Sequence, residues 1–390
     1  MVSPTFGLRS ERALRKRLCK HNINTAFFQA FFDNFSKKNY LCLIKFKEMT
    51  QKETLISIAE RTGFSISTIS RVLNGKAQKY RISEQTVRKI KEFAQKCNYT
   101  PNLTAQSLRT KRTNTVGLLV PSIDNPFFAN IANVIIHEAR LHDYTVILID
   151  SMENEKEESE GLNSLLSRNI DGVIVVPCSN TPEQLEEVAQ HTPIVLIDRY
   201  FPESSLPYVS TDNFQGSYNA TRMLLDYGHR NIRCIQGPSA SITSSERVRG
   251  YREALHDFGL DDRAVVSGSD FSIQNGYIEA KLALAEPEPP TAIFALSNTI
   301  LLGTMKAAEE AGLRIPDDLS VISFDNYTYL DFLSPAITRV NQPIEEMGIL
   351  AIKMLLQMIR DNRANHSQIL LPPTITVRDS VRAPRKTTAE

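Results

Sequence analysis

The residue types with the clearest chemical use in this sequence gather on one face of a helical segment within residues 54–75. That face carries Ile66, Ser67, Ser70, Arg71 and Asn74. Short polar groups and a guanidinium on a helix that fits the major groove of DNA reach base edges and phosphates. The segment therefore predicts a DNA-reading helix, with an ordinary amphipathic helix pair as the alternative.

The elements that must position this face form a helix-turn-helix. Ile58 and Ala59 lie on one face of a first short helix, and Gly63 stands where a tight turn between helices needs a positive φ. Ser65 is a favourable N-cap for the second helix. The apolar face of that helix consists of Ile69, Val72 and Leu73.

A second set of polar residues follows the ends of apolar, β-rich runs. These runs are residues 116–120, 146–149, 173–176, 194–197, 232–235, 292–296 and 321–324, and the residues that end them include Asp150, Asp198, Gly237, Ser297 and Asp325. Val-, Ile- and Leu-rich strands that alternate with helices indicate parallel sheets covered on both faces. Because ligands of such sheets bind beyond the carboxyl ends of the strands, we expect a small-molecule site there.

Charge divides the chain although its net charge is only +1 over 390 residues. Residues 1–48 hold 10 Lys/Arg against 3 Asp/Glu, residues 49–115 hold 13 against 4, and the remainder holds 22 against 37. A basic head on an acidic body indicates a polyanion-binding module joined to one that avoids polyanions. The length predicts two or three domains, and a hydrophobic fraction of 42% permits a sizeable core.

Cysteine usage and hydropathy argue against a secreted or membrane protein. Cys19, Cys42, Cys97, Cys178 and Cys234 form no CxxC pair, so we expect reduced thiols and neither a disulfide framework nor a zinc site. No apolar run approaches the roughly 18 residues that span a bilayer. The basic amino end precedes a Phe-rich segment at 27–35, but polar residues interrupt that segment, so no signal peptide is expected.

A third helix and a linker complete the basic head. The third helix is capped by Ser83, and its apolar stripe consists of Val87, Ile90, Phe93, Ala94 and Cys97. The headpiece then ends near Asn98, and residues 99–113 link it to the body. Residues 1–48 show no sustained apolar period, and the next methionine after Met1 is Met49. We therefore expect the native chain to start at Met49 or residues 1–48 to be a loose extension.

With its parts in this order, the chain resembles the lactose-repressor (LacI/GalR) family of bacterial transcription regulators. The resemblance rests on residues 67–75 (STISRVLNG), 98–102 (NYTPN), 105–110 (AQSLRT) and 116–128 (VGLLVPSIDNPFF). It implies a small all-α helix-turn-helix headpiece and an α/β body, similar to periplasmic binding proteins, of two parallel-sheet subdomains.

The resemblance also implies domain boundaries. The parts are an extension (1–48), the headpiece (49–98), a hinge (99–113), an effector-binding and dimerisation body (114–382) and a tail (383–390). Within the body, one subdomain takes residues 114–211 and 342–368, and the other takes 212–339 and 369–382.

For DNA, the resemblance assigns operator contacts to the second helix and to the hinge. The implied residues are Ser65, Ile66, Ser67, Thr68, Ser70, Arg71, Asn74, Ala105 and Leu108. Ile66 offers apolar contact, Ser67 is an unselective hydrogen bonder, and Arg71 suits guanine or phosphate. Leu108 corresponds to a family leucine that wedges into the minor groove, with Ala105 beside it. A buried linker leucine is the alternative for Leu108.

The loop after the second helix departs from the family. Residues 76–81 (KAQKYR) make it about three residues longer than is usual there. Its three cations contact phosphates or form a solvated face, and the sequence does not distinguish the two.

For the effector, the resemblance implies contacts from polar and aromatic residues of both subdomains. They are Asp198, Arg247, Asn298, Asp325, Phe127, Phe128 and Phe271. Multidentate planar groups beside aromatic rings suit a polyhydroxylated ring such as a sugar or a nucleoside. As alternatives, Asp325 caps a loop and Arg247 pairs with Glu246. Thr299 replaces the family's common aspartate, which leaves the contacts around Asn298 open.

Other function classes fit the sequence less well. It has no GxGxxG after a strand, P-loop, HExxH or GxSxG motif, and His137 and His142 miss the spacing of a helical metal site, so no enzyme, cofactor or metal is expected. A periplasmic sugar receptor would lack the headpiece. We therefore expect a homodimeric repressor of a carbohydrate-utilisation operon that binds a pseudo-palindromic operator in double-stranded DNA and responds to a small polar effector. We expect it in the cytoplasm, with the nucleoid and without a membrane partner.

Overall fold

The computed structural model describes residues 54–99 and 112–385. The chain divides into two compact units, Met1–Gln106 and Ser107–Glu390. The expectations for residues 1–48, for Ala105 and Leu108, and for the last five residues of the tail lie outside the described residues.

The headpiece is a bundle of three short helices that begin at hydrogen-bonding caps. They are α3 (Leu55–Thr62), α4 (Ile66–Leu73) and α5 (Glu84–Lys96). The side chains of Ser65 and Ser83 accept from backbone N–H groups in the first turns of α4 and α5, and Gly63 ends α3 with a φ of 73°. Around a core of Ile58, Ile69, Val72 and Ile90, the observed helices follow the predicted helix-turn-helix pattern.

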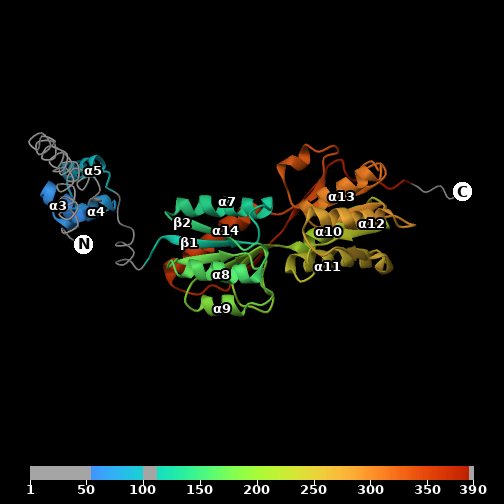
Figure 1. Ribbon diagram of the computed structural model, residues 1–390, viewed down its shortest axis with the longest axis horizontal. Coiled ribbons are helices and arrows are strands. Elements are labelled where there is room, and N and C mark those ends of the chain that lie inside the picture. Colours follow the sequence, from blue (N-terminus) through green and yellow to red (C-terminus); the bar gives the residue numbers. More distant parts are fainter. Residues whose placement is uncertain (1–53, 100–111, 386–390) are drawn as a thin grey trace, which may run out of the picture. The chain divides into compact units, whose positions relative to one another are not determined.

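The first subdomain of the body is built on a parallel six-stranded sheet in the order β11-β5-β4-β3-β1-β2. Its strands are β1 (Thr115–Val120), β2 (Thr145–Asp150), β3 (Gly172–Val175), β4 (Ile194–Ile197), β5 (Tyr208–Thr211) and β11 (Gln368–Leu371). Its helices are α7 (Pro126–Leu141), α8 (Glu155–Leu166), α9 (Glu183–Ala189) and α14 (Ile344–Asp361). α7 and α14 cover one face of the sheet, and α8 and α9 cover the other (Figure 1). Leu118 belongs to the apolar cluster that includes α7 and α14, and Leu119 to the cluster that includes α8 and α9.

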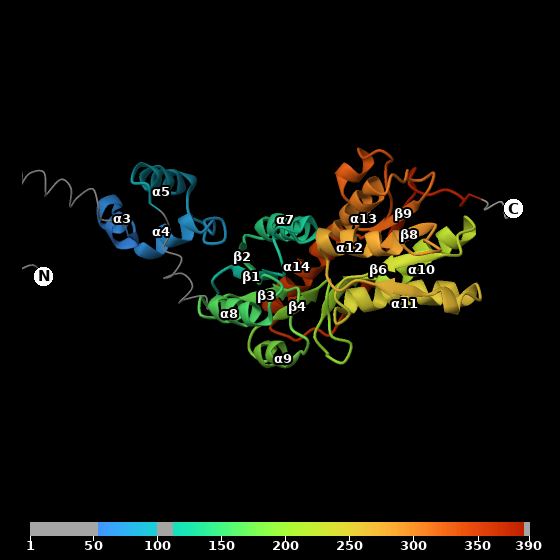
Figure 2. The same cartoon turned by 45° about the vertical axis from the view of Figure 1, so that its right-hand side comes forward.

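The second subdomain repeats this plan with the strand order β12-β10-β9-β8-β6-β7. Its strands are β6 (Ile232–Ile235), β7 (Val265–Ser267), β8 (Ala292–Ala295), β9 (Ser320–Phe324), β10 (Thr338–Asn341) and β12 (Thr374–Thr376). Its helices are α10 (Asn213–Asp226), α11 (Ile242–Asp257), α12 (Ile273–Leu284), α13 (Asn298–Glu310) and the short turns η2 (Asp261–Arg263) and η3 (Thr328–Asp331). α10 and α11 cover one face and α12 and α13 the other (Figure 2). The edge strand β12 is antiparallel to β10, so this sheet is mixed and not wholly parallel.

Small residues let α12 and α13 approach each other closely. A Cβ atom on Gly303 of α13 would lie 2.1 Å from the backbone oxygen of Ile273, and one on Gly276 of α12 would lie 2.2 Å from that of Ile300. Because these neighbours are backbone atoms, a larger side chain at either position would separate the two helices. This packing fixes the first turn of α13, which lies beside the pocket described below.

The chain changes sheet later than expected near its end. Residues 369–382 were expected in the second subdomain, yet β11 pairs with β5 in the first sheet as far as Leu371. The second subdomain likewise extends to Asn341 through β10, beyond the expected residue 339. The crossings therefore lie between β5 and α10, between β10 and α14, and between β11 and β12.

Within 54–99 and 112–385, no helix combines the length and apolar character needed to cross a bilayer. The same residues contain no cluster of three or more His, Cys, Asp or Glu side chains that could hold a metal ion.

Candidate functional site

The exposed face of α4 presents three of the residues predicted to read DNA. Ile66 is 45% exposed, although burial of a large aliphatic side chain would stabilise the folded protein. Ser67 and Arg71 are exposed on the same helix, while Ile69 and Val72 are buried against α3 and α5. The helix thus offers an apolar group, a hydroxyl that also lies 2.9 Å from Ser65 Oγ, and a guanidinium to a partner.

The other predicted residues of this helix are engaged within the headpiece. Ser65 Oγ accepts from Thr68 N at 3.1 Å and lies 2.8 Å from Thr68 Oγ1, so both side chains serve the N-cap. Asn74 Nδ2 donates to Ser70 O at 2.7 Å and to Ser70 Oγ at 3.1 Å, which closes the end of the helix. These four side chains shape and hold α4, and their operator contacts stay predictions.

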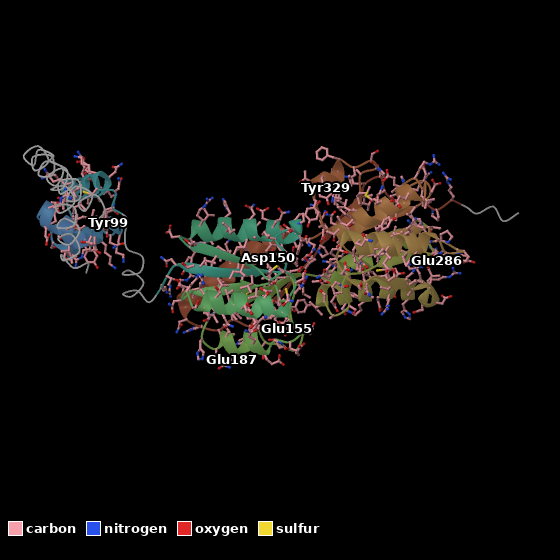
Figure 3. All side chains as sticks on the ribbon, viewed as in Figure 1. Tyr99, Asp150, Glu155, Glu187, Glu286 and Tyr329 are labelled. Atoms are coloured by element: carbon pink, nitrogen blue, oxygen red, sulfur yellow. The ribbon has the colours of Figure 1, made fainter. Side chains whose placement is uncertain are left out.

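A pocket in the body collects most of the predicted effector residues. It is a partly open hollow with about 330 Å³ of empty space, open solvent included, and is lined by Asn125, Phe127, Phe128, Asp198, Arg199, Thr243, Arg247, Phe271, Ser297, Asp325 and Gln342. The lining comes from the carboxyl ends of strands and the first turns of helices in both subdomains. Figure 3 labels Asp150 and Glu155 at the end of the first subdomain that faces the second, and Tyr329 on the adjoining part of the second.

Two aspartates in this pocket have left-handed backbone conformations. Asp198 follows β4 with a φ of 66°, and Asp325 follows β9 with a φ of 80°. A positive φ is uncommon for residues other than glycine and is found at sites where a side chain must be held in a set direction. Ser210 Oγ donates to Asp198 O at 2.5 Å, which helps to hold that turn. The two strand ends thus present carboxylates to one hollow.

Arg247 of α11 is buried in the pocket with only 4% of its surface exposed. Its Nε donates to Asn213 Oδ1 at 2.7 Å and its Nη1 donates to Leu296 O at 2.7 Å, while the guanidinium carbon lies 3.8 Å from the centre of the Phe324 ring. The alternative pairing with Glu246 is wrong, because both carboxylate oxygens of Glu246 bond to Arg249.

The electrostatics of the pocket leave an unsatisfied acceptor on Asp198. Its Oδ1 is buried and has no hydrogen-bond partner. The pKa of Asp198 is raised to about 6, mainly by burial; Arg247 and Arg199 oppose the rise, and Asp325 contributes to it. Asp325, in contrast, has hydrogen-bond partners for both oxygens, because it accepts from Gln342 Nε2 at 2.6 Å and from Asn298 N at 3.3 Å. An unsatisfied buried carboxylate is costly, which favours a ligand that donates hydrogen bonds.

Arg199 is a pocket residue that the sequence reasoning missed. It forms a bidentate pair with Glu153, at 2.7 and 2.8 Å, and its guanidinium lies over the Phe128 ring. Its position directly after Asp198 at the end of a strand was the available signal. Ser297, one of the strand-end residues named from the sequence, also lines the pocket; the other missed lining residues are Asn125, Thr243 and Gln342, of which the first two begin or cap helices at the sheet edge.

Asn298 lies beside the pocket and is not among its lining residues. Its Nδ2 bonds to the hydroxyl of Tyr329, and its Oδ1 is buried without a partner. Thr299, which replaces the family's common aspartate, donates from Oγ1 to Phe271 O at 2.5 Å. Thr299 therefore holds the segment that brings Phe271 to the pocket.

The chemical groups that line the pocket are suited to binding a small ligand. Its carboxylates accept hydrogen bonds from hydroxyl groups, its guanidinium groups donate, and Phe127 and Phe271 supply apolar surface. No cysteine, histidine or lysine lines it, so its described lining provides none of these nucleophiles or bases. A small, polar, hydroxyl-rich molecule fits this arrangement.

Comparison with known protein families divides the chain at the same place as the structure. Residues 54–102 match the family described as "Bacterial regulatory proteins, lacI family". Residues 113–380 match "Periplasmic binding proteins and sugar binding domain of LacI family". The two matches cover the headpiece and the body in turn.

Individual relatives extend this similarity over most of the chain. Catabolite control protein A of Priestia megaterium is 32% identical over 84% of this chain and 99% of its own length. The ribose operon repressor of Haemophilus influenzae is 32% identical over 84% of this chain and 98% of its own. A solved structure of a LacI family transcriptional regulator from Enterococcus faecium with bound ribose is 28% identical, with a TM-score of 0.62 over 70% of this chain and 100% of that one.

Proposed function

The chain belongs to the lacI family of bacterial regulatory proteins, and on that premise we propose that it is a transcriptional repressor controlled by a sugar. In this proposal, the exposed face of α4 reads an operator in double-stranded DNA. The pocket of the body binds the sugar that controls a carbohydrate-utilisation operon. The protein acts as a homodimer in the bacterial cytoplasm.

One observation carries the proposal most directly. A single chain joins a helix whose exposed face offers Ile66, Ser67 and Arg71 to a pocket where Asp198 Oδ1 is buried without a hydrogen-bond partner. The first feature suits a base-reading helix, and the second suits a ligand rich in hydroxyl groups. The relative with bound ribose supports a sugar as the class of effector.

The pocket also suggests how the effector acts. Asp198 and Phe127 belong to the first subdomain, whereas Arg247 and Asp325 belong to the second. A ligand that bonds to both sides favours the relative orientation of the subdomains in which all these contacts form. Next to the pocket, Thr211 Oγ1 donates to Gln342 Oε1 at 2.7 Å, so two of the crossing segments are joined there. Occupancy of the pocket thereby controls the geometry presented to the headpieces.

The test combines DNA and ligand in one assay. Fluorescence anisotropy with duplex DNA from upstream of the neighbouring operon is measured with the full chain, alone and with a panel of sugars and nucleosides. We expect tight, salt-dependent binding that one sugar changes by at least about tenfold. Binding no stronger than to unrelated DNA would contradict the repressor function, and a response only to nucleosides would contradict the sugar.

Dimerisation is supported by exposed apolar side chains on α7, α12 and the turn after η3. Ile136, Ile278, Leu282 and Phe332 are exposed, with Leu282 at 61% and Phe332 at 82%. α7 and α12 also bury side chains in one apolar cluster that runs through both subdomains. A second copy of the chain is the proposed occupant, because two headpieces related by a two-fold axis match a pseudo-palindromic operator.

Replacing Leu282 with glutamate is expected to weaken the dimer. A charge in an apolar interface loses its hydration without a partner, so we expect the dimer dissociation constant to rise about tenfold or more. Sedimentation equilibrium measures this change. Phe258→Glu, on the opposite face of the second subdomain, is the control and should leave the constant unchanged. Equal effects of the two variants would place the interface elsewhere.

Replacing Ser67 is expected to change which operator bases are preferred. Ser67 is exposed near the start of α4, where a recognition helix meets base edges. Ser67→Asn should shift preference toward adenine at one position of each half-site, because an amide can bond to both N6 and N7 of adenine. Selection from randomised half-sites measures the preference. An unchanged preference would show that another residue of α4 occupies that place.

A further inference from the structure

The loop of residues 76–81 that follows α4 is folded onto the headpiece. Ile82 N donates to Ala77 O at 3.0 Å and Tyr80 N donates to Lys76 O at 3.3 Å, which closes the loop on itself. The side chains of Ala77 and Ile82 pack against the headpiece core. The backbone leaves α4 through Gly75 at a φ of 71°. Because both ends are held by core contacts, the side chains between them have set directions.

One of these side chains, Tyr80, covers the guanidinium of Arg71. The guanidinium carbon lies 4.0 Å from the centre of the Tyr80 ring, which is a close cation–π contact. Tyr80 is itself 44% exposed, so burial of its ring does not account for this position. Among the residues that the structure describes, none accepts a hydrogen bond from the Arg71 guanidinium.

The geometry of stacking leaves Arg71 able to bind. A guanidinium stacks through its flat face, whereas its five N–H groups point outward in the plane. The ring of Tyr80 therefore restricts the orientation of Arg71 without using any donor. A long, exposed arginine otherwise loses rotamer freedom when it binds, and holding it beforehand lowers that cost.

We propose that Tyr80 is a positioning residue that holds Arg71 for the recognition of a guanine in the operator. This role rests on the proposed function, because it requires that α4 read DNA. It also assigns a role to the longer loop, whose three additional residues the family resemblance does not explain. Tyr80 acts through Arg71 and makes no base contact of its own.

The charges around Tyr80 make a matched set of controls possible. Lys76, Lys79 and Arg81 are exposed and form no ion pair with an acidic residue in the described part of the chain. Replacing Tyr80 removes no charge, so the salt dependence of DNA binding should keep its slope. Gln78, exposed in the same loop, is the neutral control.

The test is a double-mutant cycle on DNA selected by the wild-type protein from a pool of randomised duplexes. Fluorescence anisotropy measures the dissociation constants of the full-length wild type, Tyr80→Ala, Tyr80→Phe, Arg71→Ala, the double variant Tyr80→Ala with Arg71→Ala, and Gln78→Ala. We expect Tyr80→Ala to bind about twofold to fivefold more weakly. It should also lose enrichment of guanine at the position that Arg71→Ala affects. Tyr80→Phe and Gln78→Ala should match the wild type.

The cycle separates positioning from direct contact. If Tyr80 acts through Arg71, the double variant binds as Arg71→Ala does. An equal further loss in the Arg71→Ala background, or a loss in Tyr80→Phe as large as in Tyr80→Ala, would overturn the role because Tyr80 would contact DNA itself. Unchanged binding and base preference in Tyr80→Ala would also overturn it. Selection of no DNA by the wild type would overturn the repressor function and this role together.

Discussion

Replacing Arg247 with alanine is expected to abolish the response to the effector while the protein still binds operator DNA. The guanidinium is buried, donates to Asn213 and to Leu296 O, and is the largest of the charge effects that oppose the raised pKa of Asp198. A charge-assisted hydrogen bond contributes about 1.5–3 kcal/mol, so effector affinity should fall about tenfold to a hundredfold or more. Calorimetry with the effector and anisotropy on the operator measure the two activities separately.

Because Arg247 is buried, its replacement by alanine also lowers the stability of the protein, and a second substitution is needed to separate the two effects. Arg247→Ala removes a cation that interacts with both Asp198 and Asp325 and leaves Arg199 as the remaining cation beside Asp198; removing one partner of a buried charge group costs about 3–5 kcal/mol of stability. Arg247→Lys keeps the positive charge but loses the directed pair of hydrogen bonds, so it should fold normally and still bind the effector weakly.

Arg249→Ala is the control for both variants, because Arg249 is exposed on the same helix and pairs with Glu246. Normal effector affinity in folded Arg247→Lys and Arg247→Ala would mean that the arginine only supports the fold.

The apolar runs in the sequence predicted β1, β2, β3, β4, β6, β8 and β9. β4 (IVLI) and β9 (SVISF) were recognised, and the aspartates that follow them were placed in the pocket. β5 (YVST), β10 (TRVN) and β12 (TIT) were missed because each has only one aliphatic side chain, and hydrogen bonding to a neighbouring strand defines them. β7 (VVS) and β11 (QILL) were also missed although each has at least two aliphatic side chains, and with β11 the late crossing was missed.

The pocket residues that escaped prediction are those whose roles depend on distant partners. Gln342 follows β10 and reaches the site only because its side chain bonds to Asp325 and Thr211, which no local pattern encodes. Asn298 was predicted from its place at the start of α13, yet its side-chain amide bonds to Tyr329. Sequence patterns fix the element and the face on which a residue lies, whereas the rotamer depends on neighbours from other parts of the chain.

Replacing Asp198 with asparagine is expected to stabilise the protein and weaken effector binding. Burial raises the pKa of Asp198 to about 6, above its value in an unfolded chain. Below the pKa of the unfolded chain, Asp198 is protonated in both states, and its burial carries no charge. The stability that this neutral form allows is lost as the pH rises through about 6. At pH 7.5 the folded protein carries a buried charge, and asparagine should raise the free energy of unfolding by about 1–3 kcal/mol. Thermal unfolding at pH 7.5 and at pH 5 measures this difference, which should shrink at the lower pH.

Effector binding should show the opposite dependence on pH. The ionised carboxylate accepts hydrogen bonds from ligand hydroxyls through both oxygens, and protonation below about pH 6 removes part of that capacity. The wild type should therefore bind the effector more weakly at pH 5 than at pH 7.5. Asp198→Asn should bind weakly at both values, because its amide cannot titrate. If asparagine stabilises the protein but keeps the wild-type affinity and its dependence on pH, the Asp198 carboxylate does not contact the effector, and another group in the pocket must titrate.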